Sequence, residues 1–465
     1  MRLINDCNPL RLSPAIELKP EPYATCSTGR RRKIRMKFNK LGHLVLISAA
    51  ALVVSTLLAA CTSRTVDFVY IASSKAAGPN SYGQIDVMKL DSRSGTLVAL
   101  PTSPFPSGGR NPVAEVVSPD GKYLYVINHD DNTIVQFLIG SDGKIYQQST
   151  VNTPGIFPLA VAIDPGNKFL YVLDTYQPLP TCSNANPCAG SIAVFQILTG
   201  SAAIAAHVPD GEPFSGTYLP LSIGTDLVNP TALTLAANGG FLYVAAVDAT
   251  IAPLATTTAG YVFGFRVNPA ASTTSGVLTP IAGQPFIAVG IKPTGITSVP
   301  TTAGSGYSLF VSDGVNLAAA PNNTNLFRLS SAADGSLTAA GAYSAGNEPS
   351  ALAADHVGSF LYVTNATDSN ISAFAVSDAA VRFIGNYATG AQPVAILVDP
   401  HLGEFVFTAN FLGSNAVGNV SGFLINATPS SGSASVAGSL INAQSSPFIT
   451  NAQPTALAAV PHNLH

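Results

Sequence analysis

One short sequence returns seven times along this chain of 465 residues and constrains its fold more than any other feature. Each copy is a run of aromatic and β-branched residues bounded by turn-forming residues, the pattern of a short β-strand. The copies are DFVYIAS at 67–73, KYLYVIN at 122–128, KFLYVLD at 168–174, GFLYVAA at 240–246, YSLFVSD at 307–313, SFLYVTN at 359–365 and EFVFTAN at 404–410. A strand that repeats in this way predicts an array of similar small sheets.

A second motif precedes six of these strands: proline, any residue, then alanine or glycine. Its copies begin at Pro112, Pro158, Pro230, Pro293, Pro349 and Pro393. The seventh copy begins at Pro454, near the C-terminus, whereas the strand at 67–73 has no such motif before it. We therefore expect residues 454–460 to supply the innermost strand of the first unit and to close a ring, which removes the open edges of a linear array.

Two further strands complete each unit. A third strand ends in a recurrent phenylalanine, as in TIVQF at 133–137, and a weaker fourth strand follows. The sequence thus predicts an all-β fold: a seven-bladed β-propeller of four-stranded antiparallel blades over residues 67–461. The 40 Gly, 34 Pro and 10% charged residues suit many tight turns between packed sheets, and the absence of Trp excludes the WD class of propeller.

The N-terminal region has the order of parts of an export signal. Residues 30–40 are rich in Lys and Arg. The apolar residues 44–60 follow and end in Leu-Ala-Ala before Cys61. This ending resembles the bacterial lipobox, and the resemblance implies cleavage before Cys61 and attachment of lipid to it. The competing interpretation is a transmembrane anchor, because 17 apolar residues reach the lower limit for spanning a bilayer.

We expect the remaining boundaries to follow from this signal. Residues 1–35 are an extension ahead of a compact signal peptide at 36–60, and residues 61–66 are a lipidated linker. Thr62, in place of an aspartate, resembles lipoproteins sorted to the outer membrane. The expected protein is a monomer at the cell envelope, held to the membrane by the lipid on Cys61.

Charge and cysteine content limit the partners of the body. Residues 1–60 hold ten of the 22 Lys and Arg and three of the 25 Asp and Glu, so 12 basic and 22 acidic residues remain. This acidic excess argues against nucleic acid as a partner. Cys182 and Cys188 are the cysteines left after Cys61, and we expect them to form a disulfide in an oxidising compartment. A metal site is the competing interpretation, but no second Cys or His cluster stands nearby, so we expect no metal.

Alternation of strand direction predicts two unlike faces. One face carries tight turns, and the other carries the longer loops after each repeated strand together with the entries to the blades. We expect any ligand on the second face, which we call the loop face. Its predicted binding residues are Asn111, Asp130, Asp174, Lys292 and Glu348. For Lys292 and Glu348, in successive blades, an ion pair at the channel rim is the plain interpretation.

Few residues on the loop face could polarise a carbonyl group or act as a base that activates water, the two roles that hydrolysis requires. Arg110 is the candidate electrophile, and His129 or Glu115 is the candidate base. Glu115 stands close to the ring axis, where the other copies of its strand have Val, Leu or Ile, so burial is expected to raise its pKa. For each of these residues the alternative is structural: a solvated charge at a loop end, or for Glu115 a hydrogen bond between blades. No cofactor motif is present.

The repeats resemble YVTN-type propellers and the seven-bladed lactonase family, which includes 6-phosphogluconolactonase. The resemblance covers residues 67–461 and implies hydrolysis of a small sugar-type lactone. Family members that are catalytic place Arg and His within the innermost strand and an acidic residue after the second strand. Here Arg110 precedes that strand and His129 with Asp130 follows the second. The alternative is a non-catalytic propeller that binds an envelope glycan, peptide or protein.

Overall fold

The chain divides at Thr62–Ser63, and the residues that the structure describes belong to the unit Ser63–His465. The computed structural model describes residues 65–74, 82–198, 200–201, 203–206, 218–250, 259–268, 277–287, 289–301, 306–401, 403–413, 417–427 and 436–461. The expected extension, signal peptide and lipidated Cys61 lie outside these residues. Among the described residues, no helix is long and apolar enough to cross a membrane.

Seven antiparallel sheets make up the second unit, and we number them as blades in chain order. Blade 1 contains β1 (Thr65–Ser74), β2 (Gln84–Asp91), β3 (Leu97–Ala99), β4 (Phe105–Pro106) and β32 (Gln453–Pro461). Blade 2 contains β5 (Pro112–Val117), β6 (Tyr123–Asn128), β7 (Thr133–Ile139) and β8 (Ile145–Asn152). Blade 3 contains β9 (Ile156–Ile163), β10 (Phe169–Tyr176), β11 (Ser191–Ile197), β12 (Ile204–Ala206) and β13 (Tyr218–Pro220).

The remaining blades repeat this order of strands. Blade 4 contains β14 (Val228–Leu235), β15 (Phe241–Asp248), β16 (Gly260–Val267), β17 (Leu278–Pro280) and β18 (Phe286–Ile287). Blade 5 contains β19 (Pro293–Pro300), β20 (Tyr307–Asp313), the 3₁₀ turn η2 (Pro321–Asn323), β21 (Leu326–Ser331) and β22 (Leu337–Tyr343). Blade 6 contains β23 (Pro349–Ala354), β24 (Phe360–Asn365), β25 (Asn370–Val376) and β26 (Val381–Ala388). Blade 7 contains β27 (Ala391–Val398), β28 (Phe405–Leu412), β29 (Asn419–Asn426), β30 (Ser439–Asn442) and β31 (Phe448–Ile449).

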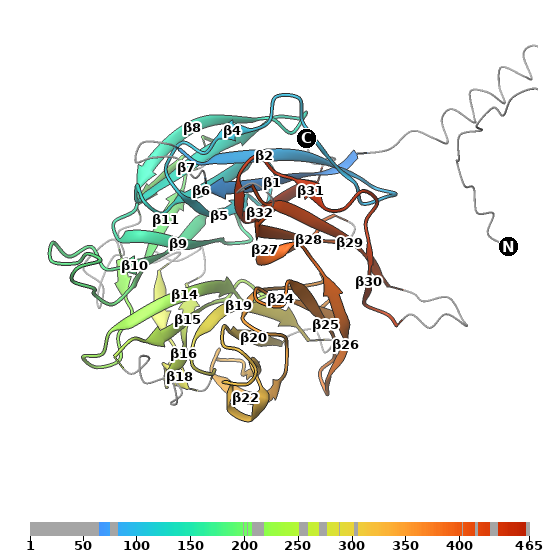
Figure 1. Ribbon diagram of the computed structural model, residues 1–465. Coiled ribbons are helices and arrows are strands. Elements are labelled where there is room, and N and C mark those ends of the chain that lie inside the picture. Colours follow the sequence, from blue (N-terminus) through green and yellow to red (C-terminus); the bar gives the residue numbers. More distant parts are fainter. Residues whose placement is uncertain are drawn as a thin grey trace, which may run out of the picture. The chain divides into compact units, whose positions relative to one another are not determined.

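The blades form a closed ring, as the displaced seventh proline motif predicts. The innermost strand of each blade contacts that of the next, from β5 through β9, β14, β19, β23 and β27 to β32 and back to β5. In Figure 1 these strands surround the middle of the unit, and the outer strands such as β8 and β22 lie at its edge. The last strand pairs with the first described strand from Asp67↔Pro461 to Ser74↔Gln453. The predicted closure by the C-terminal strand is confirmed.

The Pro-x-Ala motif marks a β-bulge that recurs in every blade. In blade 2, Pro112 pairs with Asn128 and Ala114 with Ile127, so the residue between them has no partner on the next strand. The same shift follows the repeat proline in the other six blades. Bulges bend a strand and increase its twist, which here happens at the entry to each blade.

Hydroxyl groups at three bulges join successive blades. Thr294, Ser350 and Thr455 each donate to the carbonyl oxygen of the repeat proline in the next blade, at 2.6 Å: Pro349, Pro393 and Pro112 respectively. Thr455 thus links the C-terminal strand to blade 2 across the closure. This hydrogen bond between blades adds to the hydrophobic clusters that fill each blade interface.

The tyrosine of the repeated strand also reaches the neighbouring blade. The Tyr70, Tyr243 and Tyr362 hydroxyls donate to carbonyl oxygens of Gly143, Gly335 and Gly438, in the outer turn of the next blade, at 3.2, 2.7 and 3.1 Å. All three tyrosines are fully buried. The repeated aromatic residue therefore supplies both core volume and a specific contact between blades.

Replacement of Tyr362 by phenylalanine is expected to lower the free energy of unfolding by about 1–2 kcal/mol, because the Gly438 carbonyl loses its buried donor. Urea unfolding of the purified protein measures this change. The matched control is Tyr146→Phe, since Tyr146 is 49% exposed and its loss of a hydroxyl should change nothing. Equal unfolding midpoints for both variants would contradict the assigned role of the hydroxyl.

Candidate functional site

Blade 2 brings the predicted electrophile and one predicted base together at the loop face. Arg110 lies two residues before β5, and His129 follows β6 directly. Because β5 and β6 are antiparallel and Pro112 pairs with Asn128, the two segments are neighbours. The backbone N–H of His129 donates to the Asn111 carbonyl oxygen at 3.0 Å.

Arg110 is held by two contacts to one carboxylate. Its backbone N–H donates to Asp131 Oδ2 at 2.7 Å, and its Nε donates to Asp131 Oδ1 at 2.5 Å. Its Nη2 donates to the Asp130 carbonyl oxygen at 3.2 Å. The two side chains are 38% and 22% exposed, so water weakens this ion pair and we expect it to stabilise the fold by only about 1 kcal/mol.

His129 and Asp130 form a second pair beside the first. The His129 Nδ1 and Asp130 Oδ1 atoms are 2.7 Å apart, and Asn111 Nδ2 donates to the same oxygen at 3.2 Å. Partial burial raises the pKa of Asp130, but the hydrogen bonds from His129 and Asn111 and the charge of Arg110 outweigh it and hold the pKa below its ordinary value. Asp130 is therefore an ionised partner that can orient the imidazole.

Aromatic rings continue this cluster into blade 3. The His129 ring stacks on Phe157 with 4.8 Å between centroids, and Tyr176 meets Phe157 edge-on at 6.0 Å. Phe157 has a left-handed backbone (φ 58°), a conformation that it shares with Asn111, Glu348 and Gln392 at the same position before the repeat proline. The stack on Phe157 restrains the orientation of the imidazole plane, and the contact with Asp130 restrains the position of its Nδ1 atom.

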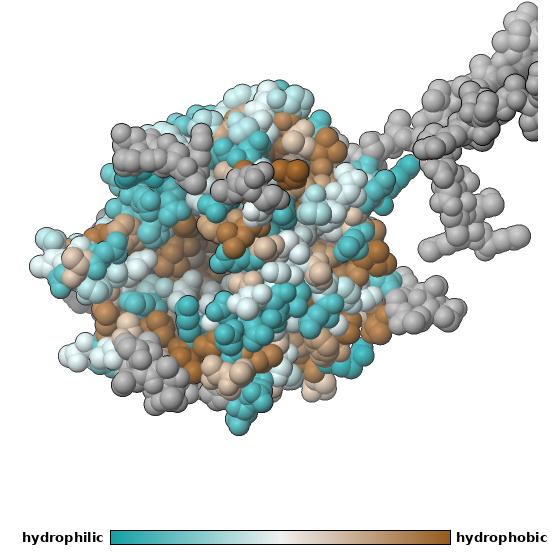
Figure 2. All heavy atoms as spheres, viewed as in Figure 1, coloured by the Kyte–Doolittle hydropathy of each residue, from teal (hydrophilic) through white to brown (hydrophobic). Residues whose placement is uncertain are grey.

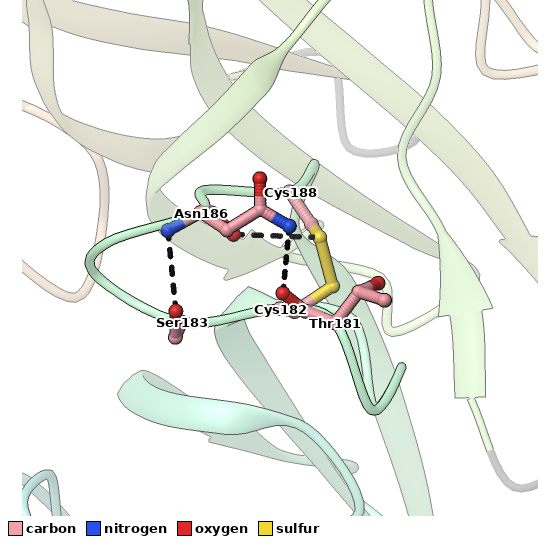
Figure 3. The surroundings of a disulfide bond; sticks show 5 residues. All are labelled: Thr181, Cys182, Ser183, Asn186 and Cys188. Carbon is pink, nitrogen blue, oxygen red and sulfur yellow. Dashed lines mark hydrogen bonds between the residues drawn. A yellow bond between two sulfur atoms is a disulfide. The ribbon is translucent and has the colours of Figure 1, made fainter.

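The Cys182–Cys188 disulfide closes the loop after Tyr176 (Figure 3). Asn186 holds the loop from inside, since its Nδ2 donates to the Thr181 carbonyl oxygen at 2.7 Å. We expect this cross-link to stabilise the fold by roughly 2 kcal/mol, because it constrains the unfolded chain. The predicted pairing of these two cysteines is therefore present in the fold.

The Arg110–Asp131 contact has counterparts in other blades. In blade 6, Asn347 donates from its backbone and from its side chain to the two oxygens of Asp368, at 2.8 and 2.9 Å. In blade 1, Asn451 contacts Asp86 in the same two ways. We call this arrangement the entry clasp. It is a structural device of the propeller, and blade 2 differs in using a guanidinium where the other two use an amide.

Glu115 does not join this cluster. It lines the channel along the ring axis, a cavity of about 340 Å³, together with Thr294, Ser350 and Thr455. Glu115 pairs with Val126 and lies three residues after Pro112 in β5. At the ordinary rise of a strand, this position is about 13 Å from Arg110. The predicted convergence of Glu115 with Arg110 and His129 is therefore wrong, because the bulge and the strand direction carry Glu115 into the channel.

The Glu115 carboxylate serves the junction that closes the ring. Its Oε1 accepts a hydrogen bond from the backbone N–H of Ala72 in blade 1 at 3.2 Å, whereas Oε2 is buried and has no hydrogen-bond partner among the described residues. Burial raises its pKa to about 8, against smaller opposing effects of the backbone N–H groups of Ala72 and Ala458. A hydrogen bond between blades is the structural alternative that the sequence offers for Glu115, and the contact with Ala72 is such a bond.

Three other predicted binding residues also differ from expectation. Asp174 is fully buried beneath Gly155 instead of lying on the loop face, and burial raises its pKa well above the ordinary value. Lys292 and Glu348, both in the described part of the chain, form no ion pair with each other. Glu348 Oε2 instead accepts a hydrogen bond from the Thr367 hydroxyl at 2.5 Å. The backbone N–H of Lys292 donates to Asp313 at 2.7 Å, in a further variant of the blade entry.

A polar groove of about 890 Å³ opens beside Arg110 between blades 1 and 2. The residues that line it include Arg110, Asp131, Tyr82, Gln147 and Thr150. None of these last three residues was predicted from the sequence. In the sequence they appear only as polar and aromatic residues in the loop after β1 and in the outermost strand of blade 2. Such residues are common on any protein surface, so they did not indicate a site.

Comparisons with known proteins agree with this architecture. The family model described as Lactonase, 7-bladed beta-propeller matches residues 81–179 and 319–440. The periplasmic gluconolactonase of Pseudomonas aeruginosa superposes with a TM-score of 0.59 at 17% identity, over 85% of this chain and 99% of that one. A candidate 6-phosphogluconolactonase from Bacteroides uniformis superposes with a TM-score of 0.62 at 17% identity, over 85% and 100%.

The chain is a lactonase-like, seven-bladed β-propeller. A curated 6-phosphogluconolactonase of Xenorhabdus nematophila is 38% identical over 95 residues, which are 20% of this chain. The match spans 27% of the length of that relative. The structural matches, at 17% identity, concern the fold.

The candidate site of the lactonase-like propeller contains two pairs of charged or ionisable groups, His129 with Asp130 and Arg110 with Asp131. Among its described residues, no group of three or more His, Cys, Asp and Glu side chains is placed to bind a metal ion. Figure 2 shows that hydrophilic and apolar residues alternate over the visible face, with a hollow near its middle. The chemistry that this surface offers is that of imidazole, carboxylate, guanidinium and hydroxyl groups.

Proposed function

We propose that this lactonase-like propeller hydrolyses a neutral sugar lactone at the loop end of blade 2. The observation that carries the proposal is the 2.7 Å contact between His129 Nδ1 and Asp130 Oδ1, next to the guanidinium of Arg110. A carboxylate that orients an imidazole leaves the other ring nitrogen to act as a base. The names of the similar proteins, 6-phosphogluconolactonase and gluconolactonase, support a lactone as the substrate class.

The reaction requires only water and the lactone. His129 Nε2 accepts a proton from water while the water oxygen bonds to the lactone carbonyl carbon. Arg110 stabilises the negative charge that develops on the carbonyl oxygen. The bond between that carbon and the ring oxygen then breaks, His129 returns its proton to the ring oxygen, and the product is the open hydroxy acid.

The charges near the site favour a substrate without phosphate. Of the described residues that line the groove, Arg110 alone is basic, and Asp131 already offsets its charge. A phosphate group requires cationic or multiple N–H donors, and the body of the chain is acidic overall. A neutral aldonolactone therefore fits these residues better than its 6-phosphate.

Non-catalytic binding of a glycan, peptide or protein is the second candidate function. The entry clasp supports it, because Asn347 and Asn451 take the place of Arg110 in blades without the His–Asp pair. On this account Arg110 is a structural residue, and the loop face presents polar groups to a ligand that it does not change.

Proton release from a panel of sugar and aromatic lactones separates the two functions. We expect the purified protein to open neutral sugar lactones faster than their phosphorylated or aromatic counterparts. The absence of turnover on every lactone of the panel would leave the binding function as the explanation of the loop face.

Placement at the cell envelope is the remaining part of the proposal, and the lipobox-like sequence before Cys61 supports it. Replacement of Cys61 by serine is expected to move the protein from the membrane fraction to the soluble fraction of its host, because the lipid then has no attachment site. Fractionation with an immunoblot measures the shift. Retention of the variant in the membrane fraction would favour the transmembrane-anchor interpretation instead.

A further inference from the structure

The groove beside Arg110 is longer than one lactone ring requires. Its volume of about 890 Å³ is near the upper limit of sites that enclose drug-sized ligands. Arg110 leads into β5, the innermost strand of blade 2, whereas Gln147 and Thr150 belong to β8, the outermost strand. Four strands at ordinary spacing place these ends about 14 Å apart. The groove therefore runs outward from Arg110 toward the outermost strand of the blade.

The outer part of the groove offers hydrogen-bonding groups without charge. Gln147 and Thr150 are both exposed, and Gln147 Nε2 donates to Thr150 Oγ1 at 3.2 Å. Thr133, at the start of β7, adds another hydroxyl to the wall. Amide and hydroxyl groups can donate and accept, so this surface matches a ligand with many hydroxyls better than an ionic one.

The lining of the groove also includes an exposed aromatic ring. Tyr82, from blade 1, is 54% exposed and lines the groove. An aromatic face next to neutral polar groups suits a sugar ring, since the C–H face of the sugar packs on the aromatic ring while its hydroxyls reach the polar groups. A peptide of mixed side chains would require apolar pockets, and the described lining residues are mostly polar.

We propose that this groove is a subsite for a sugar unit joined to the lactone ring. The preferred substrate is then the lactone at the end of a short neutral saccharide, with the lactone at Arg110 and His129 and the next sugar between Tyr82 and Gln147. This inference rests on the proposed hydrolysis for the lactone end. The outer subsite itself depends only on the groove.

Turnover of a disaccharide lactone compared with glucono-δ-lactone tests the subsite. Cellobionolactone is expected to have a kcat/KM about tenfold higher than that of glucono-δ-lactone. Tyr82→Ala and Gln147→Ala should each remove most of this difference and leave glucono-δ-lactone turnover unchanged. Tyr146→Ala is the matched control, because Tyr146 is a comparably exposed tyrosine that is not part of the groove lining. Equal kcat/KM for both lactones, or equal losses on both in Tyr82→Ala, would overturn the proposal.

A binding measurement separates failure of the subsite from failure of the hydrolysis. Saturation-transfer NMR with cellobiose reports contact with the groove whether or not any lactone is opened. Loss of the cellobiose signal in Tyr82→Ala and not in Tyr146→Ala supports the subsite, even if the panel shows no turnover and the proposed hydrolysis fails. An unchanged signal in Tyr82→Ala, or no signal in the unaltered protein, rejects it.

Discussion

Replacement of His129 by alanine is expected to lower kcat for lactone opening at least a hundredfold. A positioned general base contributes about 10²–10⁴-fold to a hydrolysis. In the proposed mechanism His129 Nε2 is that base, and Asp130 holds its ring through the 2.7 Å contact with Nδ1. The rate of proton release from a neutral sugar lactone measures the effect. Asp130→Thr should lower kcat less, because the imidazole remains but loses its orienting carboxylate.

Blade 6 supplies the matched control for these variants. Its loop Asn365-Ala366-Thr367-Asp368 corresponds to the blade 2 loop that begins at Asn128, and the Ala366 N–H donates to Glu348 O as the His129 N–H donates to Asn111 O. His129→Ala and Asp130→Thr therefore introduce side chains that this backbone already accommodates. We expect both variants to unfold at the same urea midpoint as the unaltered protein while their lactone turnover falls. Full turnover in His129→Ala would refute the assignment of the base.

Arg110→Asn extends the same comparison to the entry clasp. Asparagine at this position reproduces the contacts of Asn347 with Asp368, so the clasp can form without a guanidinium. If Arg110 stabilises the carbonyl oxygen, this variant loses kcat and keeps its unfolding midpoint. If Arg110 is only a structural residue, the variant behaves like the unaltered protein, and the binding function becomes the better account of the loop face.

Replacement of Glu115 by glutamine is expected to stabilise the fold at alkaline pH, by as much as about 5 kcal/mol above pH 8. Burial raises the pKa of Glu115 from its ordinary 4.5 to about 8. A pKa that differs by one between the folded and unfolded protein changes the free energy of unfolding by about 1.4 kcal/mol. The stability that the protonated carboxyl provides is fully present below pH 4.5 and is lost as pH rises through 8. Glutamine keeps the shape of the neutral acid and cannot ionise.

The difference in unfolding free energy between Glu115→Gln and the unaltered protein, measured by urea unfolding from about pH 5 to 9, checks this prediction. The difference isolates Glu115, because Asp67, whose pKa burial also raises to about 8, remains in both proteins. Glu115→Leu is a useful companion, since Leu occupies the corresponding position in other blades, but it leaves the Ala72 N–H without its acceptor. A difference that does not grow with pH would mean that Glu115 is ionised in the fold.

The candidate site shows where sequence reasoning reached its limit. Arg110, His129 and Asp130 were predicted to lie together because they flank the paired ends of β5 and β6, and they do. Glu115 was predicted to lie close to the ring axis, and it does line the channel. Its predicted convergence with Arg110 was wrong, because a strand moves successive residues about 3.3 Å along its axis. Lys292 and Glu348 stand in successive blades at the predicted rim, but they form no ion pair, and the Glu348 carboxylate contacts Thr367 of its own blade instead.

The sequence by itself determined the seven blades, their four-stranded order and the closure by the C-terminal strand, because each follows from strand patterns that repeat along the chain and from the one motif that is displaced. Only the tertiary structure decided which polar groups meet. The entry clasps, the burial of Asp174 and the groove beside Tyr82 arise where residues that are well separated in the sequence approach one another. Those distances depend on bulges, twist and packing between blades, and no local pattern of residues encodes them.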